Sequence, residues 1–403
     1  MHTQYEKTSL TKKEVATFGG YIDWNTQPSI FKQYPSFLFS YSFGEIEEFH
    51  FLELSRMITS KEQILTKLYY KLSTPSAGNL HPLELYIQVR GIKGVISGIY
   101  HVDAKMSKFV LLQEIEEDGL EGELGLSCKF EGIIAIVSCV PFRSEWKYGV
   151  RALRYCYLDA GHQIAAIQAS ATIYQKEMTI LSEFDVKSFN FAIGLKDEET
   201  VCAVISFAKE TEKKVKPLKK PLLHVSPTDY SDSNGDLFEV LQKQPVLKSE
   251  IFPINTTKEQ ILQRRSARKF ENVPFKNGEI ERIMHTLTKD VYPLVCYSIL
   301  FGDEKNEAGI YLNSKLLQKG EYKDRLAGIL VDQLFIKNAQ MIVVVTSKHF
   351  SAEKLMLAGA LVHKIALESS EFKSTGIGAF YDKKLQDFLG TENYILYVCA
   401  LGK

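Results

Sequence analysis

The chain has 403 residues, of which 45% are hydrophobic and 24% are charged. This composition is typical of a folded globular protein, and the length predicts two domains because single cores rarely grow beyond about 250–300 residues. Lysine plus arginine and aspartate plus glutamate number 49 each, so the formal net charge is zero. Balanced charge argues against a general attraction to nucleic acid or to an anionic membrane. We therefore expect a small ligand.

Six cysteines are spread along the chain without the paired spacing of a zinc site. Most lie in apolar stretches, and we interpret them as buried free thiols, with no disulfide framework and no metal. Residues 1–15 lack the apolar core of a signal peptide. No apolar run reaches the roughly 18 residues that a membrane-spanning helix needs. These features predict a cytoplasmic protein.

In the first half, helical and strand patterns alternate. In chain order we expect a helix over 59–72, strands over 83–89 and 133–140, a helix containing Ala160-Gly161, and a strand over 201–208. A charged, proline-containing stretch without apolar periodicity then covers residues 209–236. Such a composition is typical of a linker.

The second half repeats this order of features. We expect a helix over 278–288, strands over 294–301 and 341–347, a helix containing Ala358-Gly359, and a strand over 395–402. In both halves the tripeptide Gly-Ile-Tyr follows the first strand, at 98–100 and at 309–311. The repetition predicts an internal duplication with one domain over 1–208 and another over 237–403. Each domain is expected to be α+β, with a mixed, mainly antiparallel sheet flanked by helices.

Several short segments resemble one known family. They are PSAGNLHP (75–82), KYGVRALRY (147–155), LDAGH (158–162), RRSARKF (264–270) and GIGAF (376–380). With the opening DWNTQP (23–28), they resemble SagB/ThcOx-type dehydrogenases of the nitroreductase superfamily, in a tandem-domain form. We call residues 75–82 the proline-serine loop, 264–270 the arginine segment and 376–380 the glycine segment.

The resemblance implies a flavin site shared between two domains. In this superfamily FMN lies at the boundary of two subunits, and each subunit supplies part of each site. Here the second copy carries the arginine and glycine segments, and the first copy carries the proline-serine loop. One composite site is then complete and the other is broken. The resemblance further implies a monomeric intrachain pseudo-dimer, in which strands 201–208 and 395–402 are exchanged between the two sheets.

The arginine segment is expected to bind the FMN phosphate. The guanidinium groups of Arg264, Arg265 and Arg268 suit a phosphate monoester because they donate planar, charge-assisted hydrogen bonds, and Ser266 adds a hydroxyl. The spacing of Thr256 and Glu259 predicts a capping box for a short helix that ends at these arginines. The alternative is a solvated basic helix end.

The glycine segment and the proline-serine loop are expected on opposite sides of the flavin ring. Backbone N–H groups around Ile377, Gly378 and Ala379 are assigned to the ring edge near N5 and O4, although this segment is also compatible with an ordinary turn. From the loop, the resemblance assigns contacts to Pro75, Ser76, Ala77, Asn79 and His81. A simple connecting turn and a structural histidine remain the alternatives.

The pair Lys147-Tyr148 is the candidate catalytic pair. In azoline-oxidising relatives a Lys-Tyr pair at this place is associated with proton removal while hydride passes to flavin N5. Neighbouring Arg143, Arg151 and Arg154 would favour a neutral lysine that acts as a base. The alternative is an exposed helix face whose charges lie in water.

These inferences predict an FMN-dependent oxidoreductase that transfers hydride in two-electron steps through flavin N5. NAD(P)H is a candidate electron donor, and the substrate is a small molecule or a modified peptide. Two alternatives remain open. One is an azoline-to-azole dehydrogenase that acts on a modified peptide, and the other is a non-catalytic flavin-binding or scaffold protein.

Overall fold

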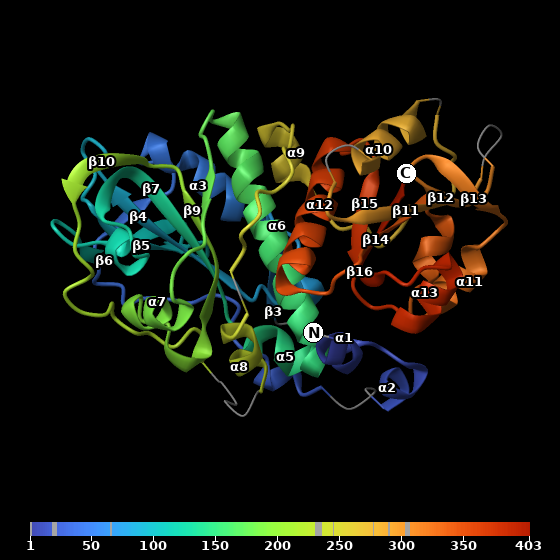
Figure 1. The fold of residues 1–403 in the computed structure, drawn as a ribbon, viewed down its shortest axis with the longest axis horizontal. Helices are drawn as coiled ribbons and strands as arrows, with labels where there is room; N and C mark the ends of the chain where they lie inside the picture. The colour runs from blue at the N-terminus through green and yellow to red at the C-terminus, as the bar shows by residue number, and fades with distance from the viewer. Residues whose placement is uncertain are drawn as a thin grey trace. The chain divides into compact units, whose positions relative to one another are not determined.

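The computed structural model describes residues 2–17, 22–64, 67–229, 236–244, 246–276, 278–288, 291–302 and 307–403. The chain forms two compact units (Figure 1). The larger unit is Asp23–Ile251, and the smaller unit combines Met1–Ile22 with Phe252–Lys403. These bounds differ from the expected domains, because the N-terminal residues join the second half of the chain and the first half continues to Ile251.

The larger unit contains an antiparallel sheet in the order β1-β6-β5-β4-β7-β9-β8, and β10 pairs with β7. Its strands are β1 (Ser40–Ser42), β4 (Leu83–Arg90), β5 (Gly98–Asp103), β6 (Lys108–Glu114), β7 (Cys128–Cys139), β8 (Thr179–Leu181), β9 (Thr200–Ser206) and β10 (Lys209–Lys214). Every residue of β4 and β5 is buried. Such runs form central strands because both faces of the sheet are covered.

Helices cover both faces of this sheet. They are α3 (His50–Arg56), α4 (Leu120–Glu123), α5 (Phe142–Tyr148), α6 (Ala152–Ile173), α7 (Val186–Ala192) and α8 (Asp236–Gln242). On one face Ile134 and Ile136 of β7 share a core cluster with residues of α4 and α7. Cys139, which has the opposite parity in the strand, interacts with Cys156 of α6. Because alternate strand residues point to opposite faces, α6 lies on the other side.

Residues 59–72 were expected as a helix, but the described residues of this range lie in two strands, β2 (Ile58–Ile64) and β3 (Lys67–Leu72). These strands pair antiparallel as a separate two-stranded sheet, which we call the hairpin. Ile58, Tyr70 and Leu72 pack in a small cluster with Phe31 and Ala104. The helical prediction was wrong because this packing prevails over the helix propensity of the Lys, Glu, Gln and Leu residues between them.

The first residues of the expected linker form β10, which pairs antiparallel with β7. Further along, the Leu222 amide donates to the Ala192 carbonyl at 2.8 Å, so this stretch is attached to the larger unit. Charged residues are as common on an exposed edge strand as in a linker, so composition did not separate the two. Residues 230–235 of the expected linker lie outside the described residues.

The smaller unit contains an antiparallel sheet in the order β13-β12-β11-β14-β16-β15. Its strands are β11 (Val295–Leu300), β12 (Gly309–Leu312), β13 (Lys315–Lys319), β14 (Met341–Ser347), β15 (Lys373–Ile377) and β16 (Tyr394–Gly402). Its helices are α1 (His2–Thr8), α2 (Lys12–Thr17), α9 (Lys258–Gln263), α10 (Glu279–Thr288), α11 (Lys323–Ile329), α12 (Ala352–Glu368) and α13 (Asp382–Leu389). Within this unit α10 and α12 lie on one side of the sheet, and α11 and α13 lie on the other (Figure 1).

The expected exchange of C-terminal strands is wrong. β9 pairs with β7 and β8 of its own sheet, and β16 pairs with β14 and β15 of its own sheet. Both edges of each strand are therefore hydrogen-bonded within one unit, which leaves no edge for a sheet elsewhere.

The two sheets follow the same path, because β6-β5-β4-β7-β9-β8 corresponds strand by strand to β13-β12-β11-β14-β16-β15. The Gly-Ile-Tyr glycines also have matching surroundings. A Cβ on Gly98 would lie 2.5 Å from Leu111 Cδ1 and 2.8 Å from the Gln113 carbonyl oxygen. A Cβ on Gly309 would lie 2.6 Å from Leu316 Cδ1 and 2.5 Å from the Gln318 carbonyl oxygen. A side chain at either position would collide with the next strand.

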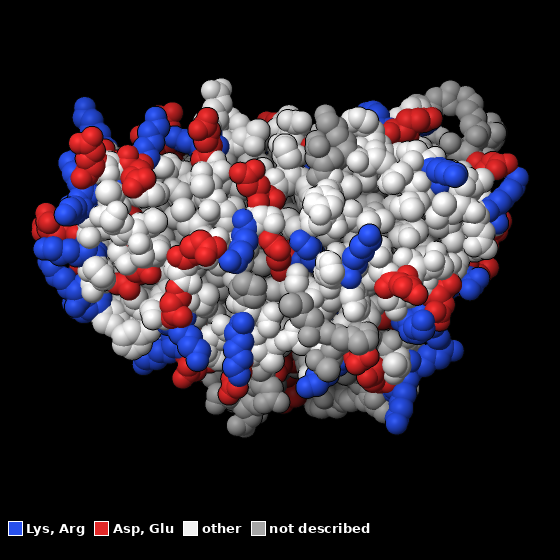
Figure 2. All heavy atoms as spheres, viewed as in Figure 1, with Lys and Arg blue, Asp and Glu red and all other residues white. Residues whose placement is uncertain are grey.

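Acidic and basic side chains are interspersed on the face shown in Figure 2, in agreement with the balanced composition. The six cysteines are free, and all except Cys128 are buried. No helix within the described part of the chain has both the length and the apolar character required to cross a membrane. The described residues also contain no group of three or more His, Cys, Asp or Glu side chains that could hold a metal ion.

Candidate functional site

The proline-serine loop joins β3 to β4 and is held by Asp159 of α6. The Ser76 hydroxyl donates to Asp159 Oδ2 at 2.6 Å, and the Ala77 amide donates to Asp159 Oδ1 at 3.3 Å. The His81 amide donates back to the Ser76 hydroxyl at 2.9 Å, which closes the loop on itself. One buried carboxylate therefore fixes the first half of the loop.

Asp159 is 4% exposed. Burial raises the pKa of its carboxyl from 3.8 to about 7, because the hydrogen bonds from Ser76 and Ala77 offset only part of the cost of burying the charge. Asp159 thus titrates near neutral pH while it contacts the loop. Its sequence motif was noted, but its partners could not be found from the sequence because they lie 82 and 83 residues away.

The second half of the loop approaches the candidate catalytic pair. Gly78 has a φ of 64°, and a Cβ there would collide with the Tyr148 hydroxyl and lie 3.3 Å from Lys147 Nζ. Lys147 Nζ also lies 5.1 Å from the ring centroid of Trp24 and 5.4 Å from that of Tyr148. Both residues of the pair are partly buried beside the loop, so the alternative of a fully solvated helix face does not describe them.

Arg143, which was expected as a neighbouring cation of Lys147, is bound within the core. Arg143 Nη2 pairs with Glu84 Oε1 at 2.7 Å, and Arg143 Nη1 donates to the His81 carbonyl at 3.1 Å. Its charge is therefore matched within the core, and its main link to the site is through the loop backbone. The His81 ring nitrogen Nε2 lies 3.1 Å from Asn79 Oδ1, which favours the structural interpretation of this buried histidine.

Glu84, at the start of β4, is the centre of a buried ion network. It interacts with Arg143 and also with Arg56 Nη2 and His101 Nε2, each at 3.1 Å. Burial alone would raise the pKa of Glu84, but Arg143, His101 and Arg56 together hold it well below its ordinary value. Lys32 joins the network, since its amide donates to Glu84 Oε1 at 2.9 Å. The network anchors the strand that follows the loop.

In the smaller unit, α9 presents the arginine segment as expected. Its capping box lies one residue later than predicted, because Thr257 is the N-cap and Gln260 replaces Glu259 as the reciprocal partner. A glutamine side chain also accepts a backbone N–H bond, so the motif works with either residue. The helix ends at Gln263, directly before Arg264.

The arginine segment lies beside the strand that leads to the glycine segment. Ser266 forms a parallel β-bridge with Ser374, and the Ala267 amide donates to the Ser374 carbonyl at 2.9 Å. β15 then runs from Lys373 to Ile377, and Gly378 and Ala379 follow it. Two segments that are more than a hundred residues apart are therefore neighbours.

The positions of the expected cofactor-binding residues differ in exposure. Pro75, Ser76, Ala77, Asn79, Arg264, Gly378 and Ala379 are partly buried, His81 and Ile377 are buried, and Arg265, Ser266 and Arg268 are exposed. Ile377 belongs to the hydrophobic core of the smaller unit, so only its backbone is available to a ligand. The Ala379 carbonyl accepts from Gln333 Nε2 at 3.2 Å, which fixes the backbone at the end of this segment.

The donor set of the arginine segment fits a phosphate monoester. Burial and the adjacent Arg265 lower the pKa of Arg264 to about 10. Like charges held close together repel each other, and a dianionic ligand would relieve that repulsion. Ser266, which is exposed one residue further along, adds a hydroxyl donor. The chemistry of this segment is therefore compatible with the phosphate end of FMN.

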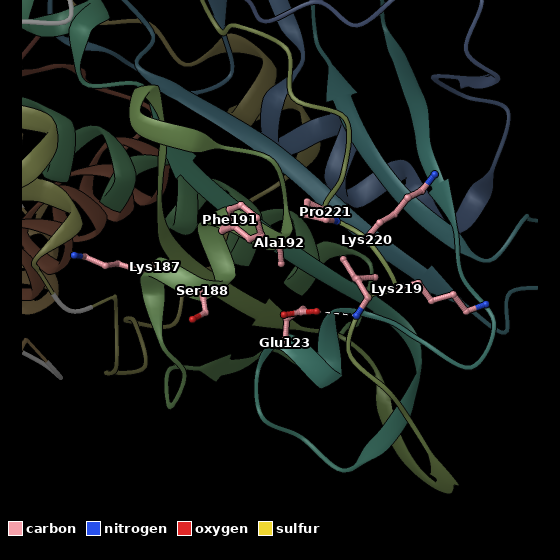
Figure 3. Close-up of a pocket in the computed structure, with 9 residues that line it drawn as sticks. Glu123, Lys187, Ser188, Phe191, Ala192, Lys219, Lys220 and Pro221 are labelled. Carbon is pink, nitrogen blue, oxygen red and sulfur yellow. Dashed lines mark hydrogen bonds between the residues drawn. The ribbon is translucent and has the colours of Figure 1, made fainter.

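The larger unit also contains cavities. One of about 290 Å³ is lined in part by Asn79 of the proline-serine loop. Another, of about 460 Å³, lies among α4, α7 and residues 218–221 (Figure 3). Its lysines, Lys187, Lys219 and Lys220, point outward and away from one another in Figure 3. No expected site residue lines this second cavity, and its diverging ammonium groups do not form an anion site.

No family model matches the sequence. A protein of Methanocaldococcus jannaschii named "Putative nitroreductase MJ1384" is 31% identical over 126 residues. This match covers 30% of the chain and 62% of the relative, which is less than two thirds of its length.

The fold has a full-length counterpart among solved structures. A crystal structure of a "putative nitroreductase" from Anabaena variabilis superposes with a TM-score of 0.81, covering 100% of this chain and 99% of that one at 18% identity. A second nitroreductase, from Desulfovibrio desulfuricans and in complex with FMN, covers 36% of this chain and 83% of its own at 15% identity, and its TM-score of 0.27 carries no weight. The full-length superposition and the antiparallel sheets together give the chain a nitroreductase-like α+β fold.

Proposed function

We propose that the protein is an FMN-dependent oxidoreductase of the nitroreductase superfamily that transfers hydride through flavin N5. One composite site would hold the flavin, with the arginine and glycine segments of the smaller unit and the proline-serine loop of the larger unit. The bound flavin would supply the two-electron chemistry. The residues of the chain would orient it, exclude water and place proton-carrying groups beside it.

One observation carries this proposal. Within each unit, segments that are distant in sequence and were assigned to the same flavin lie next to each other. Gly78 approaches Lys147 and Tyr148 in the larger unit, and Ser266 pairs with Ser374 beside the glycine segment in the smaller unit. Neither juxtaposition is required by the order of strands alone, so both are consistent with a shared ligand.

The assigned roles follow from these contacts. Arg264, Arg265, Ser266 and Arg268 would bind the phosphate, and the amides around Gly378 and Ala379 would meet the ring edge. The loop residues Pro75 to Asn79 would approach the ring from the other side, and His81 would hold Asn79 in place. Lys147 and Tyr148 would deliver or accept the substrate proton beside Gly78.

We further propose that the two units arose by duplication and act as a monomeric pseudo-dimer. The identical path of the two sheets and the matching surroundings of Gly98 and Gly309 support this origin. Only one composite site would be complete, because the second half lacks a proline-serine loop and the first half lacks an arginine segment. The chain would therefore bind one FMN. We propose a cytoplasmic protein whose substrate is a small molecule or a modified peptide, with NAD(P)H as a candidate electron donor.

An absorption spectrum and an FMN titration of the purified protein test the proposal. We expect FMN to bind more tightly than riboflavin, because riboflavin has no phosphate for the arginine segment. Replacing Arg264 by alanine should weaken FMN binding about tenfold or more, since a hydrogen bond to a charged group contributes roughly 1.5–3 kcal/mol. Riboflavin binding should stay unchanged. A protein that binds no flavin at all would end the proposal.

The azoline-to-azole dehydrogenase is the second candidate, and the position of Lys147 and Tyr148 beside the loop favours it. Loss of azoline oxidation in Lys147→Ala, with FMN binding retained, would support this activity, whereas unchanged oxidation would remove the lysine from the reaction. The third candidate, a non-catalytic flavin-binding or scaffold protein, is distinguished by its rate of NADH oxidation. With a panel of electron acceptors, this rate would not exceed that of free FMN.

A further inference from the structure

A cavity of about 290 Å³ lies beside the proline-serine loop in the larger unit. Most of its lining comes from residues 27–31, the β3 strand of the hairpin and the turn that contains Lys105. Asn79 of the loop also lines it, and this residue connects the cavity to the segment that we assign to the flavin.

Aromatic side chains form one part of the lining. Phe31, Tyr69 and Tyr70 all border the cavity. The rings of Phe31 and Tyr70 meet edge to face, with their centroids 5.3 Å apart, and both belong to the cluster that anchors the hairpin. This part of the wall is therefore fixed by packing, and a fixed aromatic wall favours a planar apolar ring.

The charge among the described lining residues is positive. Lys105 is the basic residue of the set, and the lining residues that the structure describes include no aspartate or glutamate. Lys105 Nζ donates to Gln33 Oε1 at 2.9 Å, which orients the ammonium group. Asn79 adds an amide that is itself held by the 3.1 Å contact between its Oδ1 and His81 Nε2. These groups favour an anionic substituent on the ligand.

The size of the cavity restricts the ligand further. Cavities that hold drug-sized ligands have volumes of about 300–1,000 Å³, so this one is at the lower end of that range. It suits a single aromatic ring and is too small for a dinucleotide. The nicotinamide donor would therefore have to bind elsewhere.

We propose that this cavity binds the substrate of the flavin site and that the substrate class is a small aromatic carboxylate. This assignment rests on the proposed function, because Asn79 is the link between the cavity and the flavin-contacting loop. The aromatic ring would lie against Tyr70 and Phe31, and the carboxylate would meet Lys105. The hairpin, which carries Tyr70, is then part of the recognition site.

Calorimetric titration with two matched probes tests the proposal. The probes are 4-nitrobenzoate and the neutral 4-nitrobenzyl alcohol, each added to the full chain with and without saturating FMN. We expect the carboxylate to bind about tenfold more tightly than the alcohol, a difference of about 1.4 kcal/mol. Lys105→Met should abolish this preference, and Lys93→Met, which removes an exposed lysine outside the cavity, should preserve it. Tyr70→Leu should weaken both probes to a similar extent.

The two proposals can fail separately. If the chain binds no FMN but still prefers 4-nitrobenzoate in a Lys105-dependent manner, the cavity assignment stands as a binding site and the proposed function falls. If FMN binds normally and 4-nitrobenzoate does not bind, the cavity assignment falls. Equal affinity for the two probes, or a preference that survives in Lys105→Met, overturns it as well.

Discussion

Ser76 and Asp159 are joined by a hydrogen bond of 2.6 Å from the serine hydroxyl to the aspartate carboxylate, across 83 residues of sequence. The bond attaches an irregular loop to the long helix α6, which is buried along most of its length. Since Asp159 also accepts the Ala77 amide, its protonation changes the hydrogen bonding of the loop. The hydrogen bonding of the loop that we assign to the flavin therefore depends on the protonation state of Asp159.

Asp159 should make the stability of the protein depend on pH. Its folded-state pKa of about 7 exceeds the ordinary value of 3.8, so the folded chain holds this proton more tightly than the unfolded chain. The resulting stabilisation is fully present below about pH 4 and is lost as the pH rises through 7. It amounts to about 4 kcal/mol at most, because one pKa unit corresponds to about 1.4 kcal/mol.

Denaturant unfolding of Asp159→Asn between pH 4 and pH 8 measures this effect. The variant should lose the decrease in the free energy of unfolding that the wild type shows as the pH rises over this interval. Asp185→Asn is the control, because Asp185 is exposed and its pKa is lowered by the Ser188 amide, so its removal must not flatten the same decrease. An unchanged slope in Asp159→Asn would contradict the assignment.

Gly78→Ala should damage the site by two separate effects. The φ of 64° disfavours any residue with a Cβ, and that Cβ would collide with the Tyr148 hydroxyl. Gly94→Ala isolates the first effect, because Gly94 has a φ of 78° but no atom within 4 Å of its added Cβ. The control should lose about 1–2 kcal/mol of stability. Gly78→Ala should lose more and should also weaken FMN binding, as a flavin titration of both variants would reveal. Equal behaviour of the two variants would show that the approach of Tyr148 is unimportant.

Glu84→Gln should strongly destabilise the larger unit. The substitution removes the charge that Arg56 and Arg143 share in the core, and breaking a buried ion pair in this way costs about 3–5 kcal/mol. Because the pKa of Glu84 is held well below its ordinary value, its contribution is fully present above the ordinary glutamate pKa and is lost only in strong acid.

Thermal or denaturant unfolding at neutral pH measures the change in Glu84→Gln. Glu183→Gln provides the comparison, since Glu183 forms an exposed ion pair with Lys248 and should change stability little. A Glu84→Gln protein as stable as this control would mean that the network does not depend on the glutamate charge.

The sequence predicted the elements whose signal is local. β4, β14 and β16 were expected within one residue of their observed bounds, and the expected strand over 133–140 covers the apolar second half of β7. Ala160-Gly161 and Ala358-Gly359 lie inside long helices, α6 and α12, as expected. The hairpin was missed because Ile64, Leu68 and Leu72 recur at helical spacing although they lie in two strands. Local patterns identified elements where propensity and packing agree.

The partners within the site were harder to predict. Lys32 pairs with Glu199 across 167 residues, and no spacing rule connects two such positions. The prediction of exchanged C-terminal strands was wrong for a related reason. It was inferred from the resemblance alone, because the sequence of an apolar strand such as β16 does not specify which sheet the strand joins. The arginine segment and the glycine segment could be assigned to one ligand only through the resemblance, and the bridge between Ser266 and Ser374 lies beside the glycine segment.

The central claim is that the arginine segment and the proline-serine loop hold the same FMN. Calorimetric FMN titration of the wild type, Arg264→Ala, Asn79→Ala and the double variant tests it most directly, with Arg282→Ala as an exposed-cation control from the smaller unit. We predict one FMN per wild-type chain, weaker binding at that one site in each single variant, and weaker binding still in the double variant. Two FMN sites per chain, or a site that responds to Arg264→Ala and is indifferent to Asn79→Ala, would contradict the account.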